Sequence, residues 1–167
     1  MSRAVTSGTL LKAVLRARDW HIYRVFEREY VRAASSIGED LYAPSPRTLR
    51  RWQNGESEVP HGYHMSVLEA MLPGYTAEEL FTPFDLLAGD PVPAPTPDRL
   101  QDGVCILCAL TSCADQMCAR LHAGSVWTWC PRCKGRGCRH DDDCIAGRRE
   151  VYDYTAEDSD SEMRVAA

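Results

Sequence analysis

Eight cysteines, all of them after residue 104 of this 167-residue chain, are the residues whose type and spacing bear most directly on chemistry. They form two groups, C-x2-C-x4-C-x4-C and C-x2-C-x4-C-x5-C, whose first members lie 25 residues apart. Zn²⁺ binds four thiolates tetrahedrally, and a C-x2-C turn supplies two of them without strain. The pattern therefore predicts two zinc ions, with the ligands Cys105, Cys108, Cys113, Cys118, Cys130, Cys133, Cys138 and Cys144.

The same cysteines would form disulfides in an oxidising compartment, so the compartment decides between the two interpretations. The first twenty residues hold no apolar run long enough for a signal sequence, and no later stretch is apolar enough to span a bilayer. We therefore expect a cytoplasmic protein with reduced thiols and no membrane contact.

Two resemblances predict different pairings of the cysteines. The first group is similar in spacing to zinc knuckles, which implies that each group closes a site by itself. The stretch "CPRCKGRG" resembles the CxxCxGxG turn of DnaJ-type zinc domains, which implies that the two C-x2-C pairs share one ion. On that second pairing the other ion would be held by Cys113, Cys118, Cys138 and Cys144. The sequence leaves both pairings open.

A site with four cysteine ligands has no open coordination position, so the metal is expected to be structural and the protein not an enzyme. The chain also shows no set of nucleophile, base and orienting group, and no phosphate-binding loop. Neither cysteine group shows the C-x2-C-x2-C run of ferredoxin-type iron–sulfur proteins. His122 and His140 are alternative ligands, although we interpret both as solvated loop residues.

Basic residues surround the second cysteine group, and two tryptophans, Trp127 and Trp129, precede it. Basic side chains beside aromatic rings suit phosphate contact and base stacking, which makes this module a second candidate for nucleic-acid contact. A solvated loop with both tryptophans packed on the zinc core is the alternative, and a protein-binding surface is a third. The basic residues concerned are Arg132, Lys134, Arg136 and Arg139.

Apolar residues in the first half of the chain recur at spacings of three and four, which is typical of helices. The spacing predicts a helix around residues 10–15 and another over residues 22–37. A third is expected to begin at Pro60 and to stop at Pro73 and Gly74, and Thr76 with Glu79 has the spacing of a capping box. With the helix of residues 46–54, described next, this gives a mainly α domain of about five helices.

The stretch "SPRTLRRWQNG", residues 45–55, predicts a short helix with Ser45 as its N-cap and a stop at Gly55. Leu49 and Trp52 lie three residues apart and would form its buried edge. Arginine can bind guanine or phosphate, glutamine can pair with adenine, and threonine can contact phosphate or a thymine methyl group. The candidate DNA-binding residues are therefore Ser45, Arg47, Thr48, Arg50, Arg51 and Gln53; a solvated helical face is the alternative.

The order of these elements over residues 9–82 resembles the lambda-repressor-like helix-turn-helix regulators of the XRE family. The resemblance is carried by "LRRWQNG", a following proline, "VLEAMLPG" and "TAEELF". It implies a helix-turn-helix fold in which residues 46–54 form the recognition helix, with Ser45, Arg47, Thr48 and Arg51 meeting DNA. It also implies sequence-specific binding of duplex DNA in transcription regulation.

Composition divides the chain into four parts. Prolines alternate over residues 89–99, which predicts a semi-rigid linker between a helical domain, residues 1–88, and a small irregular zinc-binding domain, residues 100–154. The acidic residues 155–167 are expected to be disordered. The net charge of −5 argues against a globally basic surface. We therefore expect a DNA-binding regulator whose zinc module aids contact with nucleic acid or a protein partner. The alternative is a protein-interaction adaptor that does not bind DNA. The sequence is also compatible with a homodimer.

Overall fold

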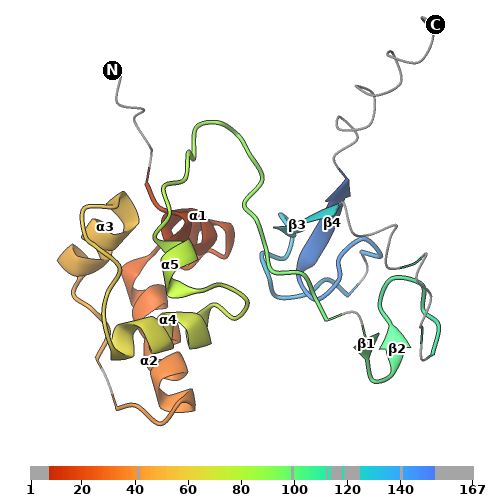
Figure 1. The fold of residues 1–167 in the computed structure, drawn as a ribbon, viewed down its shortest axis with the longest axis horizontal. Helices are drawn as coiled ribbons and strands as arrows, with labels where there is room; N and C mark the ends of the chain where they lie inside the picture. The colour runs from red at the N-terminus through yellow and green to blue at the C-terminus, as the bar shows by residue number, and fades with distance from the viewer. Residues whose placement is uncertain are drawn as a thin grey trace, which may run out of the picture.

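The computed structural model describes residues 8–40, 42–98, 100–111, 113, 118, 125–139 and 141–152. Five helices occupy the first half of this part of the chain, and four short strands follow (Figure 1). The five helices agree with the predicted number. The elements are α1 (Leu10–Ala17), α2 (Tyr23–Ser36), α3 (Pro46–Asn54), α4 (Tyr63–Met71), α5 (Ala77–Leu80), β1 (Leu100–Gln101), β2 (Val104–Cys105), β3 (Ser125–Trp129) and β4 (Arg148–Tyr152).

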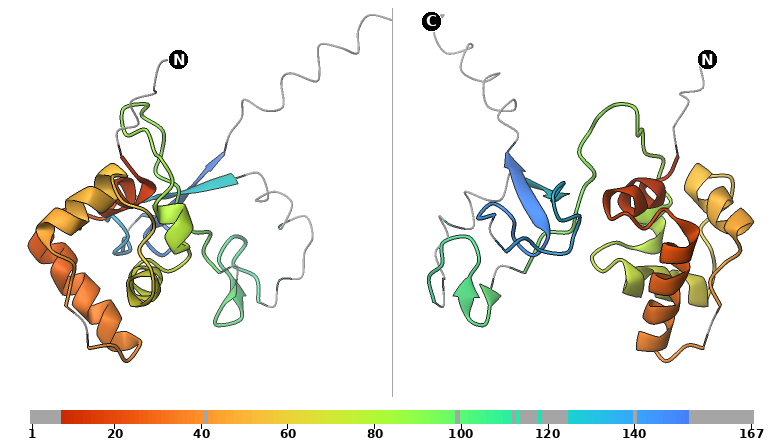
Figure 2. Two further views of the ribbon diagram at one scale, coloured as in Figure 1. Left: turned by 60° about the vertical axis from the view of Figure 1, so that its left-hand side comes forward. Right: turned by 180° about the vertical axis from the view of Figure 1, so that it is seen from behind.

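The helices surround one apolar core, and they lie together on one side of the strands (Figure 2). Leu11 and Leu15 of α1 and Phe26 of α2 are completely buried, as their spacing predicts. Ile22 and Ile37, the two ends of the helix predicted over residues 22–37, are 56% and 41% exposed. These two residues cap the ends of α2 instead of lying within it, so the helical period no longer turns them towards the core.

Both ends of α3 are formed by local sequence. The Ser45 hydroxyl accepts a hydrogen bond from the Thr48 amide at 3.2 Å, and Pro46 begins the helix. At the other end Gly55 has a φ of 70°. The amide of Glu56 donates to the Arg51 carbonyl at 2.9 Å, which satisfies a carbonyl that the helix leaves unpaired.

The fourth helix begins three residues later than predicted. Proline at position 60 suits a first helical turn, but Gly62 has a φ of 63° and a ψ of −133°, which interrupts the helical conformation. The helix therefore starts at Tyr63, whose side chain is 49% exposed. The following helix α5 has the predicted capping box between Thr76 and Glu79.

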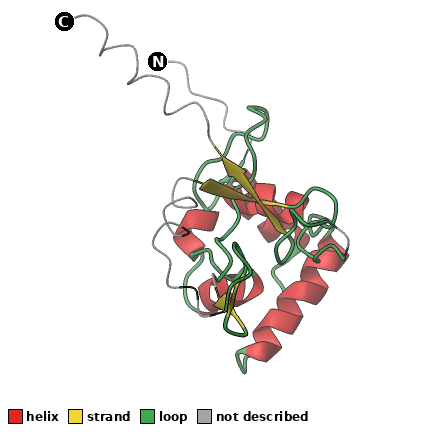
Figure 3. Cartoon of the chain, turned by 90° about the vertical axis from the view of Figure 1, so that its right-hand side faces the viewer, coloured by secondary structure: helices red, strands yellow, loops and turns green. Residues whose placement is uncertain are grey.

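The second half of the described chain consists mostly of turns and loops (Figure 3). Strands β1 and β2 pair antiparallel across Asp102 and Gly103, which have φ values of 52° and 76°; such a two-residue turn matches the twist of a hairpin. Strands β3 and β4 form a separate antiparallel pair in which Trp129 lies opposite Arg148. The predicted disordered tail lies outside the described residues.

The proline-rich linker packs against both halves of the chain. The Ala94 amide donates to the Trp127 carbonyl of β3 at 2.7 Å, and the side chains of Val92 and Ala94 pack on the helical core. Proline lacks an amide hydrogen but keeps its carbonyl. Accordingly, the Pro95 carbonyl accepts a hydrogen bond from Arg148 at 2.8 Å. The alternating prolines predicted a semi-rigid linker. They gave no sign that the carbonyl groups of this linker accept hydrogen bonds from the C-terminal part of the chain.

Candidate metal centres and arginine-rich helices

The first candidate metal centre contains Cys105, Cys108, Cys113 and Cys118. Their sulfur atoms all lie within 4.8 Å of one another, which is close enough for all four to bind one metal ion. Cys105 ends strand β2 and is completely buried. Its sulfur lies 3.9 Å from that of Cys118.

The second candidate centre contains Cys130, Cys133, Cys138 and Cys144, again with all sulfurs within 4.8 Å of one another. The sulfurs of Cys130 and Cys138 are 3.8 Å apart, and those of Cys133 and Cys144 are 3.6 Å apart. A tetrahedral zinc site with Zn–S bonds of about 2.3 Å places its sulfurs about 3.8 Å apart. The donor set therefore fits a tetrahedral zinc ion, and all eight cysteines are free of disulfide bonds.

Each centre uses cysteines that are contiguous in the sequence. Of the two pairings that the sequence left open, the structure adopts the one implied by the zinc-knuckle spacing. The interleaved pairing implied by the DnaJ-type turn is not formed. His122 and His140, the alternative ligands, lie outside the described residues.

The two C-x2-C turns have the same backbone geometry. In the first, the Ala109 amide donates to the Cys105 carbonyl at 2.8 Å; in the second, the Lys134 amide donates to the Cys130 carbonyl at 2.8 Å. Ala109 and Lys134 both have positive φ values, 58° and 53°. Positive φ is uncommon in non-glycine residues, so its occurrence at the same point of both turns is a shared feature. The repeat seen in the sequence spacing is therefore also a repeat of local structure.

Another close contact shapes the second centre. Gly147 lies against the backbone of Gly135, and a Cβ atom at position 147 would approach the Gly135 carbonyl carbon to 2.5 Å. The Gly147 carbonyl accepts a hydrogen bond from the Cys130 amide at 2.9 Å. The turn before β4 thus holds the first cysteine of this centre in place.

Individual cysteine thiols in the two centres have different pKa values. Burial acts to raise the pKa of Cys130, but hydrogen bonds from the Cys133 and Arg132 amides outweigh it and lower the pKa to about 7. Burial raises the pKa of Cys118 and of Cys138 to about 12. A metal ion that binds four thiolates must therefore displace protons from the more basic thiols.

The basic residues of the second centre do not form the aromatic–cationic surface that the sequence suggested. Trp127 and Trp129 are only 5% and 8% exposed, so neither ring is available for base stacking. Lys134 forms an ion pair with Asp19 at 2.9 Å, and Arg136 donates to the Cys133 carbonyl at 3.2 Å. Arg132, Arg136 and Arg139 remain exposed.

Helix α3 has a buried edge and a basic outer face. Leu49 and Trp52 are 3% and 4% exposed, as predicted. The Ser45 and Thr48 hydroxyls form a hydrogen bond with each other at 2.9 Å, so both take part in capping the helix. Thr48 and Gln53 are half-buried, whereas the exposed members of the predicted DNA-binding set on α3 are Arg47, Arg50 and Arg51.

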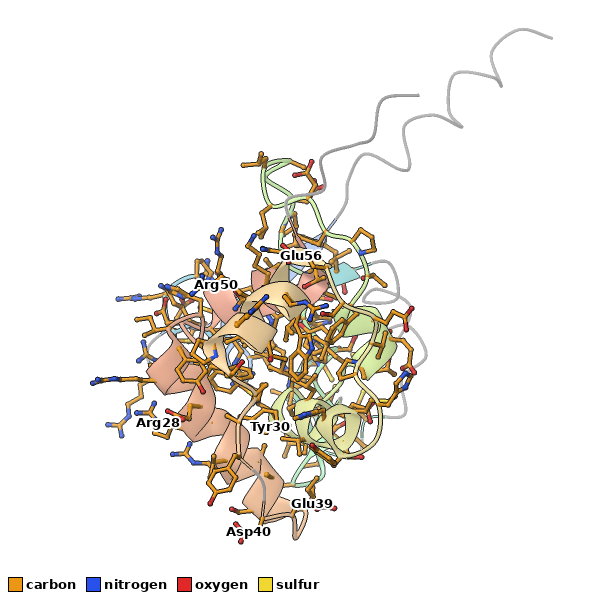
Figure 4. All side chains as sticks on the ribbon, turned by 90° about the vertical axis from the view of Figure 1, so that its left-hand side faces the viewer. Arg28, Tyr30, Glu39, Asp40, Arg50 and Glu56 are labelled. Carbon is orange, nitrogen blue, oxygen red and sulfur yellow. The ribbon has the colours of Figure 1, made fainter. Side chains whose placement is uncertain are left out.

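A second row of arginines, which the sequence analysis missed, lies on α2. Arg24, Arg28 and Arg32 follow one another at intervals of four and are exposed. The nearly buried carboxylate of Glu29 forms ion pairs with Arg28 at 3.0 Å and with Arg32 at 2.7 Å, while both arginine side chains stay mostly exposed. Figure 4 shows Arg28 of α2 and Arg50 of α3 on the same face of the molecule. The four-residue spacing was the signal for this row.

No known protein family, curated protein or solved structure matches this chain. No helix in the described part of the chain is long and apolar enough to cross a membrane. A function must therefore be inferred from the cysteine centres and from the arginine-rich helices themselves.

Proposed function

We propose that the protein is a DNA-binding transcriptional regulator that reads duplex DNA with helix α3. The observation that carries this proposal is the division of α3 into a buried edge, Leu49 and Trp52, and an exposed face with Arg47, Arg50 and Arg51. Such a helix can be anchored to a domain by one side while the other offers guanidinium groups to base edges and phosphates. Sequence specificity would come from these groups together with Gln53.

The arginines of α2 support the same proposal. Arg28 and Arg32 are held by Glu29 but are 64% and 70% exposed, so their remaining N–H groups are available to an anion. Guanidinium groups suit phosphate oxygens, because their planar set of N–H groups can donate two parallel hydrogen bonds. The arginines that α2 and α3 expose supply local attraction for DNA even though the net charge of the chain is −5.

The test is binding to random duplex DNA across a salt series. The Arg47→Ala, Arg51→Ala double variant should weaken binding and should reduce the slope of log affinity against log salt by about 2, because two phosphate neutralisations are lost. The Arg47→Lys, Arg51→Lys variant is the matched control. It should keep the slope and bind random duplex DNA more tightly than the alanine variant, because lysine keeps the positive charge that neutralises phosphate.

Absence of DNA binding by the unaltered chain at low salt would refute this function. A protein-interaction adaptor that does not bind DNA would then be the favoured function.

We propose further that both cysteine centres hold zinc and that the zinc is structural. Four cysteine ligands fill a tetrahedral site, so no position is left for a reacting water or substrate. The described residues of the C-terminal part form short strands and include few large buried side chains, so metal would supply much of the folding free energy of this part. The metal would thus stabilise the module instead of performing chemistry.

Native mass spectrometry of the full chain tests the zinc assignment. The purified protein should carry two zinc ions, and chelation should remove them with a loss of structure centred on residues 100–152. One ion per chain, or iron in place of zinc, would contradict the assignment. The Cys108→Ser and Cys133→Ser variants should each retain one ion.

A further inference from the structure

Trp129 joins the second cysteine centre to the helical domain. It precedes Cys130 directly, yet its indole is 8% exposed and belongs to the core formed by the helices. The indole N–H donates to the Tyr75 hydroxyl at 3.0 Å, and that hydroxyl in turn donates to the Pro93 carbonyl. A residue adjacent to a metal ligand is thus fixed inside another part of the fold.

Arg18, at the C-terminal end of helix α1, packs against the same ring. The guanidinium carbon of Arg18 lies 4.0 Å from the ring centroid of Trp20 and 4.6 Å from that of Trp129, so the cation is placed between two indoles. Burial lowers the pKa of Arg18. The two aromatic faces offset part of the cost of taking this charge out of water.

The turn between the second and third cysteines of this centre completes the contact. A Cβ atom on Gly135 would lie 3.2 Å from the Trp129 ring and 3.3 Å from the Arg18 guanidinium carbon, so only glycine fits here without displacement. The neighbouring Lys134 forms its 2.9 Å ion pair with Asp19, just after α1. Lys134 and Asp19 both have positive φ, 53° and 61°.

The opposite end of α1 is attached to α3. The buried Thr9 hydroxyl donates to the Trp52 carbonyl at 3.1 Å, and the Thr9 amide donates to the Gln53 carbonyl at 3.0 Å. Lys12 adds a hydrogen bond to Asn54 at 3.3 Å. Helix α1 therefore contacts the second cysteine centre at one end and the arginine-rich helix at the other.

The first cysteine centre occupies a different place. Strands β1 and β2, the second of which ends at Cys105, lie on the far side of β3 and β4 from the helices (Figures 1 and 2). Among the described residues, the helical core includes Trp129, which precedes Cys130, but neither Val104 nor Ile106, which flank Cys105. The two centres have similar turns but unequal positions relative to the helical domain.

We propose that the second cysteine centre is a metal-dependent latch, in which bound zinc shapes the turn of residues 130–138 so that Trp129, Lys134 and Gly135 seat on the end of α1. Loss of this zinc releases the C-terminal module from the helical domain and loosens α1, and through Thr9 it loosens α3. The first centre has no such effect. The latch rests on the zinc assignment made above, and it adds metal-dependent control of the arginine-rich helix.

The matched variants are Cys133→Ser and Cys108→Ser, because each removes the second cysteine of a C-x2-C turn. Both are made in the full chain and loaded with Zn²⁺, and native mass spectrometry counts the ions bound. Hydrogen exchange then reports the protection of the α1 amides. Cys133→Ser should lose one ion and at least about tenfold of this protection, whereas Cys108→Ser should lose one ion and keep α1 protection within about twofold.

A variant at the contact between the second centre and α1, Trp129→Ala, covers the case in which Cys133→Ser does not fold. Trp129→Ala should keep both zinc ions and still lose α1 protection, and chelation should then lower that protection no further. In the unaltered chain, chelation should produce the full loss. A further loss on chelating Trp129→Ala would show that zinc acts on α1 by another route and would overturn the latch.

The outcomes separate the latch from the zinc assignment. If Cys133→Ser loses one ion but α1 keeps its protection, the latch is wrong while the zinc assignment stands. Equal loss of α1 protection in Cys133→Ser and Cys108→Ser also overturns the latch. A wild-type chain that binds no zinc overturns both proposals.

Discussion

His64 lies at the meeting point of three aromatic rings from three helices. Its ring nitrogen Nδ1 is hydrogen-bonded to the Tyr30 hydroxyl, and its ring packs edge-on against Trp52 with centroids 5.2 Å apart. The ring centroid of Tyr63 lies 4.4 Å from that of His64. Burial raises the pKa of the Tyr30 hydroxyl, which therefore stays protonated and can donate to an unprotonated Nδ1. This arrangement favours the neutral form of His64 in the folded protein.

Stability should therefore depend on pH through His64. Burial lowers its pKa below the ordinary value of 6.5. As the pH falls through 6.5, the unfolded chain takes up a proton that the folded chain resists, so the free energy of unfolding should fall. Below the folded-state pKa this loss should level off. Urea unfolding between pH 7.5 and 5.5, followed by tryptophan fluorescence, measures the change.

The control for this prediction is His64→Gln, which keeps a hydrogen-bond acceptor near Tyr30 but does not titrate. Its free energy of unfolding should fall less steeply than that of the unaltered chain over the same pH range. Equal slopes would show that His64 does not contribute, because any acid sensitivity of the cysteine centres is common to both proteins.

Helix α3 is the element that local sequence determines most completely. Its N-cap, its proline in the first turn and its glycine stop all act within a few residues, and the helix has the predicted bounds of Pro46 to Asn54. Helix α4 shows the opposite case. A proline signal was available at position 60, but the backbone conformation of Gly62 was not visible in the sequence, so the start was predicted too early.

Substitutions at Ser45 can test the stability of α3 and its proposed contact with DNA separately. Ser45→Ala should lower the free energy of unfolding by about 1 kcal/mol, because the Thr48 amide loses its acceptor. Ser45→Asp should keep the cap and nearly all of the stability, but its negative charge at the helix start should weaken DNA binding. Urea unfolding and DNA titration of both variants measure these effects. Similar DNA affinities for Ser45→Asp and the unaltered chain would place this end of α3 away from the phosphates.

The molecule as a whole is held together through its proline-rich segment. Tyr75, Trp129 and the Pro93 carbonyl form one chain of hydrogen bonds that crosses from α-helical to cysteine-rich structure. Burial raises the pKa of Tyr75 to about 12, so its hydroxyl keeps the proton that it donates to Pro93. The two halves therefore do not pack independently of the segment between them.

Gly74 tests this packing. A Cβ atom at position 74 would lie 2.3 Å from the Cβ of Pro95, whereas one at Gly38 would meet nothing within 4 Å. Both glycines have positive φ, 92° and 79°, so alanine is strained at either position. Gly74→Ala should cost about 1–3 kcal/mol more than Gly38→Ala in urea unfolding, because it also displaces the linker. Equal costs would mean that Pro95 does not pack on Gly74 in solution.

The sequence by itself determined the eight candidate ligands, the helix count and the bounds of α3, because spacing and caps act over a few residues. It could not choose which cysteines share a centre, since both pairings satisfy the same ligand count; the backbone turns that gather each set decided that. Tertiary structure also decided the role of Trp129. The basic residues near it in the sequence suggested a nucleic-acid surface. In the structure its ring packs against helices more than forty residues away. A contact over that sequence distance leaves no signal in the residues next to Trp129.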